Sequence, residues 1–228
     1  IYLVSGLLIR NIKMAKNTKT DILDAAELLF SQYGFTQTSM REITTQANVN
    51  LASVNYHFGS KKNLIQSVLK RYFDILMPEV ALCLKSLSPS MGTRGIAELL
   101  QSLIPPMLKL NTLGPNGTAI FVQLLGRGYN ETQGHLRRFI MTNYGETVRA
   151  LVASIQRCLP ELPEEELFWR LHFAMGSFVF SMASSQALTE IAESDFHKQV
   201  EIEEVISHLV PFVAQGLAGN LPNNISTI

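Results

Sequence analysis

The sequence has few charged residues and only two cysteines. Charged side chains make up 17% of its 228 residues, while hydrophobic side chains make up 46%. Because a disordered chain carries more charge and fewer apolar residues, this composition excludes that class and predicts a globular protein with a real core. Cys83 and Cys158 lie in apolar segments and form no CxxC pair. We predict that both are reduced core thiols, which indicates a cytoplasmic protein.

The sequence also lacks the motifs of enzymes and metal sites. Its histidines have neither HxxxH nor HExxH spacing, and the chain contains no GxSxG motif and no phosphate-binding loop. Metallohydrolases, serine hydrolases and P-loop enzymes each depend on one of these arrangements. We therefore expect no enzymatic activity, no metal and no cofactor.

No segment has the pattern of a membrane span. Residues 1–9 are mostly apolar but too few to cross a bilayer. Residues 167–188 are also apolar, but Arg170 and His172 within them favour a buried helix. Met14 resembles the natural start of the chain, so we expect residues 1–17 to be an extension or a disordered N-terminus.

Acidic residues are missing from one long stretch near the N-terminus. Between Glu42 and Asp74 there is no Asp or Glu. Residues 1–73 contain nine Lys or Arg against four Asp or Glu, although the whole chain has a net charge of zero. A basic first third on an acidic remainder predicts a module that binds a polyanion, fused to a part with another role. The alternative is an uneven scatter of surface charge.

Nearly every segment has helical periodicity, and none alternates convincingly like a strand, so we predict an all-α fold. The first helix is expected over residues 18–33. A capping box, Ser39 with Glu42, opens a short second helix, and Asn50 caps a third that runs to about residue 57. The later helices are expected at about 61–87, 96–110 (split or kinked by two prolines), 117–128, 133–158, 164–189 and 200–217.

These helices predict two domains. Two short helices joined by a tight turn, the second rich in small polar side chains, form a helix-turn-helix arrangement. We therefore expect a three-helix helix-turn-helix DNA-binding domain over residues 18–65. A larger helical domain for effector binding and dimerisation should cover residues 66–218, followed by a disordered tail at 219–228.

The second helix of this motif carries the candidate DNA-binding side chains. An inner apolar stripe can lock the motif together, which leaves Asn50, Ser53, Asn55, Tyr56 and His57 facing outward or along the edge. Short polar side chains can reach base edges in the major groove, where Asn reads adenine, while Tyr and His can donate to phosphates. The alternative for Tyr56 and His57 is a packed hinge against the body.

The stretch AELLFSQYGFTQTSMREITTQANVNLASVNYHFGSKKNL closely resembles the N-terminal domain of TetR-family transcriptional regulators. The resemblance covers about residues 18–65. It implies a homodimer in which each third helix enters the major groove of a palindromic operator. It also implies contacts with the DNA backbone at Thr38, Ser39 and Arg41, contacts with bases or adjacent phosphates at Asn50, Ala52, Ser53, Asn55 and Tyr56, and contacts with phosphates at His57 and Lys61.

The chain departs from the family pattern inside this helix. Leu51 stands where the family often has lysine or another polar residue, which puts one phosphate contact in doubt, and Asn55 stands where tyrosine is frequent. The run VNLASVNYHFGSK resembles the subset of the family that responds to fatty acids or their acyl thioesters, so an apolar or acyl-type effector is expected.

The body carries the candidate effector pocket and the candidate dimer interface. Methionine and aromatic side chains on the middle helices can line a pocket for a flexible apolar ligand, although they fill ordinary cores more often. Arg170 is expected either to meet an anionic head group or to be paired structurally. The predicted pocket consists of Phe121, Leu124, Leu125, Phe139, Met141, Trp169, Arg170, Phe173 and Met175.

Two apolar helices, 164–189 and 200–217, are expected to form the dimer interface, unless their apolar stripes only fill the core of one monomer. The sequence thus predicts a repressor that a small apolar or amphipathic effector releases from a palindromic operator. The alternative is a DNA-binding regulator whose body only dimerises or is controlled by a protein partner.

Overall fold

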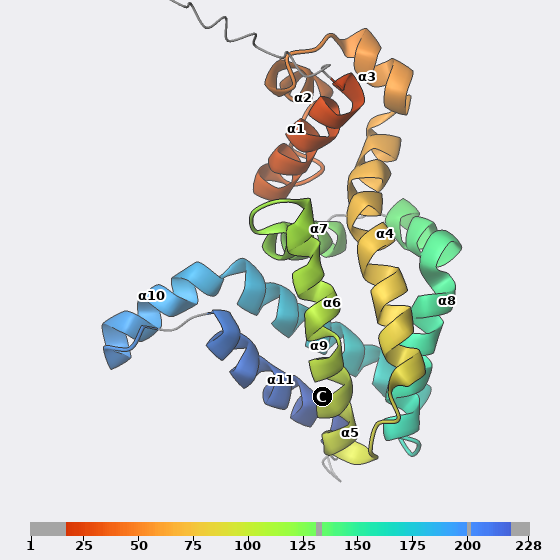
Figure 1. The fold of residues 1–228 in the computed structure, drawn as a ribbon, viewed down its shortest axis with the longest axis vertical. Coiled ribbons are helices and arrows are strands. Elements are labelled where there is room, and N and C mark those ends of the chain that lie inside the picture. The colour runs from red at the N-terminus through yellow and green to blue at the C-terminus, as the bar shows by residue number, and fades with distance from the viewer. Residues whose placement is uncertain (1–16, 131–133, 200–201, 220–228) are drawn as a thin grey trace, which may run out of the picture.

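The computed structural model describes residues 17–130, 134–199 and 202–219, and these residues form helices and connecting loops without a strand (Figure 1). The prediction of an all-α fold, with a helix-turn-helix head and a larger helical body, is confirmed. The elements are α1 (Thr18–Tyr33), α2 (Met40–Gln46), α3 (Leu51–Phe58), α4 (Lys61–Ser86), α5 (Gly92–Ser102), α6 (Ile104–Leu108), the 3₁₀ helix η1 (Lys109–Leu113), α7 (Gly117–Asn130), α8 (Gly134–Cys158), α9 (Glu164–Ala183), α10 (Ser185–Phe196) and α11 (Ile202–Ala218).

The first four helices begin at polar caps. The Ser39 and Glu42 side chains form the predicted capping box, with the Ser39 backbone N–H donating to Glu42 Oε2 at 2.7 Å. The side chains of Asn50 and Ser60 accept hydrogen bonds from the first turns of α3 and α4. Because each cap acts within three residues, the sequence predicted these boundaries correctly.

The three-helix head closes over its own apolar core. The Phe30 and Phe35 rings meet edge to face, with centroids 5.3 Å apart. Ile43 on α2 and Val54 on α3 are fully buried with them. This core holds α3 in place and leaves its opposite side at the surface.

The long helix α4 links the head to the body (Figure 1). It packs along α8, while α5 packs against α11 and α7 against α9. The predicted interruption at Pro105 and Pro106 is confirmed, since α5 ends at Ser102 and the short helices α6 and η1 follow. No helix in the described part of the chain is long and apolar enough to cross a membrane.

The prediction of one helix over residues 164–189 is wrong. Helix α9 ends at Ala183, and α10 begins at Ser185 in a new direction, projecting as an arm from the body (Figure 1). Residues 193–196, expected in a loop, are the last turn of α10, which ends where His197 adopts a left-handed backbone conformation with φ 53°. Apolar residues continue at helical spacing across Ser184 without a glycine or proline, so the sequence contained no signal for this break.

Candidate nucleic-acid interface

Helix α3 is fixed at both ends by local hydrogen bonds. Asn50 Oδ1 accepts from the Ser53 backbone N–H at 2.8 Å and from the Ser53 hydroxyl at 3.0 Å. At the other end, Gly59 has φ 71° and donates its N–H to the Asn55 carbonyl. Glycine adopts this positive φ without strain, which ends the helix sharply before α4. The Asn50 and Ser53 side chains are therefore engaged with each other inside the free protein.

One side of α3 is exposed and carries four of its residues. Leu51, Ala52, Asn55 and Tyr56 are all at the surface, with Tyr56 85% exposed and Leu51 50% exposed. Their spacing of i, i+1, i+4 and i+5 places them on one helical face. Val54 lies on the opposite side and is fully buried. We call the four exposed residues the reading face.

Other predicted DNA-binding residues are at least partly exposed on the head, with one exception. Ser39 and Arg41 are exposed at the start of α2. His57 is half-buried, and its ring meets that of Tyr56 edge to face with centroids 5.1 Å apart. Thr38 is only 2% exposed, and its hydroxyl donates to the Gly34 carbonyl at 2.8 Å. The Thr38 side chain thus stabilises the inside of the head and is not presented at the surface.

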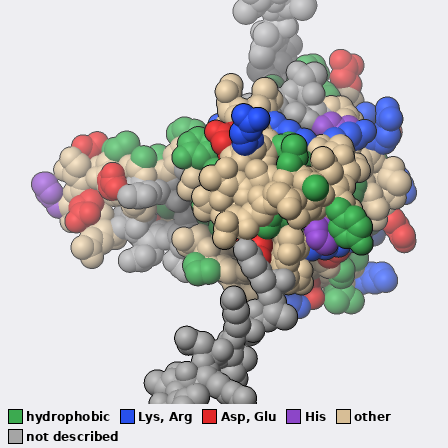
Figure 2. Space-filling model, turned by 90° about the horizontal axis from the view of Figure 1, so that it is seen from above, with side chains coloured by type: hydrophobic (Ala, Val, Ile, Leu, Met, Phe, Trp, Pro, Cys, Tyr) green, Lys and Arg blue, Asp and Glu red, His purple; other side chains and the backbone are tan. Residues whose placement is uncertain are grey.

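The part of the head around α3 contains basic residues but no acidic ones. No Asp or Glu occurs over residues 43–73, which include all of α3 and its connection to α4. Lys61 bridges back to the loop before α2, donating to the Thr36 carbonyl at 3.3 Å. Seen from above, several Lys and Arg side chains lie in the upper part of the view, with a few acidic side chains beside them (Figure 2). Along the sequence, Glu42 is the acid closest to α3. Hydrogen bonds from Ser39 hold the pKa of Glu42 below its usual value, which keeps this carboxylate ionised within the capping box.

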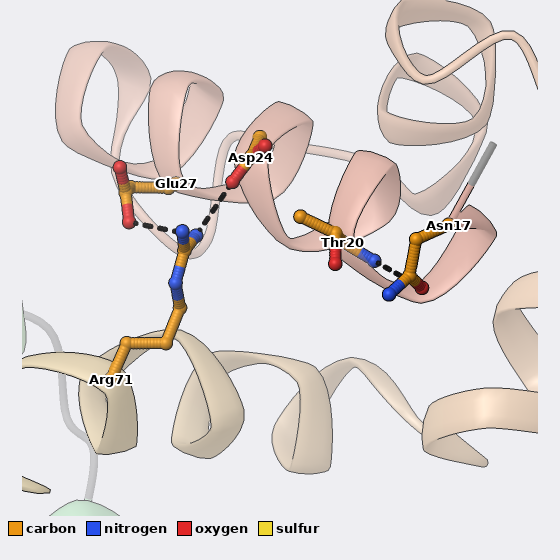
Figure 3. A network of polar contacts seen from close by, with 5 residues as sticks. All are labelled: Asn17, Thr20, Asp24, Glu27 and Arg71. Atoms are coloured by element: carbon orange, nitrogen blue, oxygen red, sulfur yellow. Dashed lines mark hydrogen bonds and ion pairs between the residues drawn. The ribbon is translucent and has the colours of Figure 1, made fainter. Parts of the chain in front are cut away.

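Polar contacts tie the head to the body through α1. Arg71 on α4 donates to Asp24 at 2.8 Å and to Glu27 at 3.2 Å, both on α1 (Figure 3). Burial raises the pKa of Glu27, although Arg71 opposes the shift. Arg127 on α7 donates to the carbonyl of Gln32 near the end of α1 at 2.9 Å. A displacement of α4 or α7 in the body would therefore reach the head directly.

Sequence reasoning did not single out the Arg71 contacts. Their partners lie 44 and 47 residues away in the chain, so no local spacing reveals them. The only signal was a lone arginine in a helix that links two domains.

The predicted pocket residues divide between the interior and the surface. Phe121 and Leu124 are fully buried on α7. The Phe121 ring stacks on Tyr72 and meets Phe73 edge to face, each with centroids 5.3 Å apart. These aromatic rings fill the space between α4 and α7. Leu125 and Phe139 pack partly buried against the same core.

The remaining predicted pocket residues do not join that interior group. Trp169 and Phe173 on α9 are 50% and 67% exposed, with their rings stacked at a centroid distance of 6.3 Å. Met141 is also exposed, and Met175 is partly buried. The nine predicted residues therefore do not surround one cavity.

Arg170 has the paired structural arrangement that the sequence left open. Its side chain is 9% exposed and donates to Glu166 Oε1 at 2.7 Å. The same guanidinium donates to the carbonyls of Leu217 at 2.8 Å and Gly219 at 2.6 Å. These are carbonyls at the C-terminal end of α11, which a cation stabilises. Arg170 thus joins α9 to α11.

The described part of the chain has hollows away from the predicted pocket. One, of about 600 Å³, lies among the end of α9, the arm α10 and helix α11. A second, of about 310 Å³, lies between α4 and α8. Neither lining contains a predicted pocket residue. The larger hollow exists because of the turn at Ser184, which explains why the sequence did not indicate it. Its lining residues are Ser181, Leu188, Ala192, Phe196, Lys198, Glu204, Val205, His208, Leu209 and Phe212.

Comparison of this chain with known proteins shows which family it belongs to. Residues 22–68 match the family model described as bacterial regulatory proteins of the tetR family. Residues 101–216 match the model described as the tetracyclin repressor-like C-terminal domain. The chain belongs to the TetR family. The predicted resemblance of the head is therefore confirmed. It also extends to the body, where no sequence motif had indicated the family.

Individual TetR relatives resemble this chain over about a quarter of its length. YttP of Bacillus subtilis (strain 168), named as an HTH-type transcriptional regulator, is 38% identical over 61 residues. IcaR of Staphylococcus aureus (strain Newman), named as a negative transcriptional regulator of a biofilm operon, is 40% identical over 58 residues. These matches cover 27% and 25% of this chain, and the chain spans only 30% and 31% of the length of these relatives.

The fold similarity reaches further than the sequence similarity. A TetR-like transcriptional regulator from Rhodococcus sp. RHA1 aligns with a TM-score of 0.55 at 18% identity. The alignment covers 89% of this chain and 97% of the Rhodococcus chain. The TetR architecture of head and body is therefore shared along nearly the whole length, although the sequence identity over this alignment is low.

Proposed function

We propose that this TetR-family protein is a homodimeric transcriptional repressor that a small apolar or amphipathic effector releases from a palindromic operator. The reading face is the observation that supports this most directly. It presents an amide, a phenol and two apolar side chains on a short helix that has no acidic residue within it. Such a helix fits the major groove, where an amide can pair with adenine. IcaR, which is 40% identical to this chain over 58 residues, is named as a negative regulator, which favours repression.

We propose residues 18–65 as the DNA-binding domain and residues 66–218 as the dimerisation and effector domain, acting in the cytoplasm. On the DNA, Asn55 and Tyr56 contact bases or adjacent phosphates, and Ser39, Arg41, His57 and Lys61 contact the backbone. The Asn50 and Ser53 side chains hold the helix terminus. Asn50 can still offer its amide N–H donors to DNA, while the Ser53 hydroxyl, whose hydrogen is donated to Asn50, can only accept.

The dimer is proposed to form through α9 and α11. Helix α9 exposes four large aromatic side chains, Phe168, Trp169, Phe173 and Phe180, each at least 50% exposed. Phe212 on α11 is 66% exposed as well. Large contiguous apolar surfaces are uncommon on monomers and mark contact sites. A second copy covering these helices would remove the aromatic rings from water.

Control of DNA binding is proposed to pass along α4 and α7. Two half-sites on one face of the DNA lie about 34–36 Å apart, so changing the separation of the two α3 helices weakens binding without altering any base contact. Arg71 and Arg127 provide the connections by which such a change would reach α1.

One observation favours the second candidate function, a DNA-binding protein whose body only dimerises or answers to a protein partner. The Tyr72, Phe73 and Phe121 rings fill the space in which the apolar effector was expected. An effector would have to displace these rings or use another hollow.

Selection from random duplex DNA tests the DNA-binding role. The full chain should enrich a palindromic sequence, and Asn55→Ala should lose affinity for it by about tenfold or more, as expected for one bidentate base contact. Gln101→Ala removes an exposed amide from α5 in the body and is the matched control, with unchanged affinity. Failure of the chain to enrich any sequence would contradict the proposal.

Native mass spectrometry tests the dimer and the effector. The wild type should be a dimer, and Phe173→Glu should be a monomer because it places charge in the aromatic surface. A small-molecule mass that mild denaturation releases would support an effector, with an acyl chain supporting the fatty-acid subset. A clean dimer would favour the second candidate function, and a monomeric wild type would contradict the two-half-site arrangement.

A further inference from the structure

Leu51 has an unusual place for a large aliphatic side chain. It is the first residue of α3, belongs to the reading face and is 50% exposed. The side chains that hold α3 to the head are Val54 and Phe58, both buried on the other side. Folding of the head therefore does not depend on the outer half of the Leu51 side chain.

The surroundings of Leu51 are suited to DNA. The segment contains no acid over residues 43–73, and Asn55 lies one turn further along the same face. Leucine cannot donate to a phosphate, so it cannot make the backbone contact that a lysine would make here. An apolar group on a surface that faces base edges needs an apolar partner on those edges.

The major groove offers one such partner. Among the four bases, only thymine presents a methyl group in this groove, at C5. We propose that Leu51 packs against the C5-methyl of a thymine in each operator half-site and so makes the protein select thymine there. This inference depends on the proposed function as an operator-binding protein.

The helix geometry limits where this thymine lies. Leu51 and Asn55 are four residues apart, which is about 6 Å along a helix axis. Base pairs follow one another every ~3.4 Å along the duplex. The selected thymine should therefore lie one or two base pairs from the base that Asn55 contacts.

Replacing thymine by uracil tests the proposal with a change of one methyl group. Each thymine of the selected operator is replaced in turn by deoxyuridine in both half-sites, and the affinity of the full chain is measured by fluorescence anisotropy at fixed salt. We expect one position at which uracil weakens wild-type binding by about fourfold per half-site, the value for burying one methyl group. Leu51→Ala should bind the thymine and uracil operators equally at this position.

Two further variants separate this contact from general effects. Leu28→Ala makes the same truncation at an exposed leucine of α1, 41% exposed, and should keep the wild-type preference for thymine. Leu51→Lys should lose the preference and show a steeper salt dependence, because a lysine can contact phosphate.

The outcomes distinguish this inference from the proposed function. Equal binding of thymine and uracil operators by the wild type at every position would overturn the inference while leaving the operator-binding function intact. The inference would also be overturned, with the operator-binding function intact, if Leu51→Ala kept the full preference for thymine. If no operator can be selected at all, the proposed function fails, and the inference fails with it.

Discussion

The buried guanidinium of Arg170 allows a sharp test of how the body is held together. In Arg170→Met, an apolar side chain of similar length replaces the arginine, so packing is largely kept while three charged hydrogen bonds are lost. These bonds join Arg170 to Glu166 at 2.7 Å and to the carbonyls of Leu217 at 2.8 Å and Gly219 at 2.6 Å.

The expected loss in the free energy of unfolding is about 2–4 kcal/mol. Removing one partner from a buried ion pair costs roughly 3–5 kcal/mol, and each hydrogen bond to a charged group contributes about 1.5–3 kcal/mol. The Glu166 side chain is 29% exposed, so water can replace part of what it loses. The expected loss is therefore set about 1 kcal/mol below that of a fully buried ion pair.

Urea unfolding followed by circular dichroism measures the effect, at one fixed protomer concentration because the proposed dimerisation would contribute to stability. The control is Arg94→Met. Arg94 pairs with Glu98 over the same four-residue helical spacing and through the same Nε atom, at 3.0 Å, but is 84% exposed. Exposed pairs contribute about 0–1 kcal/mol. Equal losses in the two variants would refute the role assigned to Arg170.

Three further predictions concern the head and its contact with the body. Asn50→Ala removes the cap that binds Ser53 and should lower the free energy of unfolding by about 1 kcal/mol in urea titrations; an unchanged midpoint would contradict this. Burial raises the pKa of Glu27 above 4.5, so its contribution to stability is complete below pH 4.5 and is lost as the pH rises through the raised value; Glu27→Gln should lack this decrease when unfolding is measured across that range. Arg127→Met should lower stability by about 0.5–1 kcal/mol and speed amide hydrogen exchange near Gln32, whose carbonyl loses its donor; unchanged exchange there would disprove the α7 connection.

The sequence predicted the head well because its determinants are local. Ser39, Asn50 and Ser60 each begin a helix through hydrogen bonds to residues three positions away, so the helix boundaries could be read from spacing. The exposed side of α3 follows from helical periodicity once Val54 and Phe58 are assigned to the core. Thr38 was the exception, since its burial depends on how the loop before α2 folds against α1.

The body was predicted less well because residue type does not reveal which apolar side chains meet. Phe121 and Phe173 are both phenylalanines on neighbouring helices, yet Phe121 is 1% exposed and Phe173 is 67% exposed. The break at Ser184 and the hollow beside α10 arise from the packing of α9, α10 and α11. Arg170 illustrates the same limit, because its partners at the end of α11 lie 47 and 49 residues away.

The mass of the complex formed on one selected operator duplex tests the central claim most directly. If two reading faces read one palindrome, native mass spectrometry should show two protomers, or a multiple of two, on the full palindrome. A duplex with one half-site scrambled should lose most of the affinity. A complex with a single protomer that binds the intact and half-scrambled duplexes equally would contradict the account.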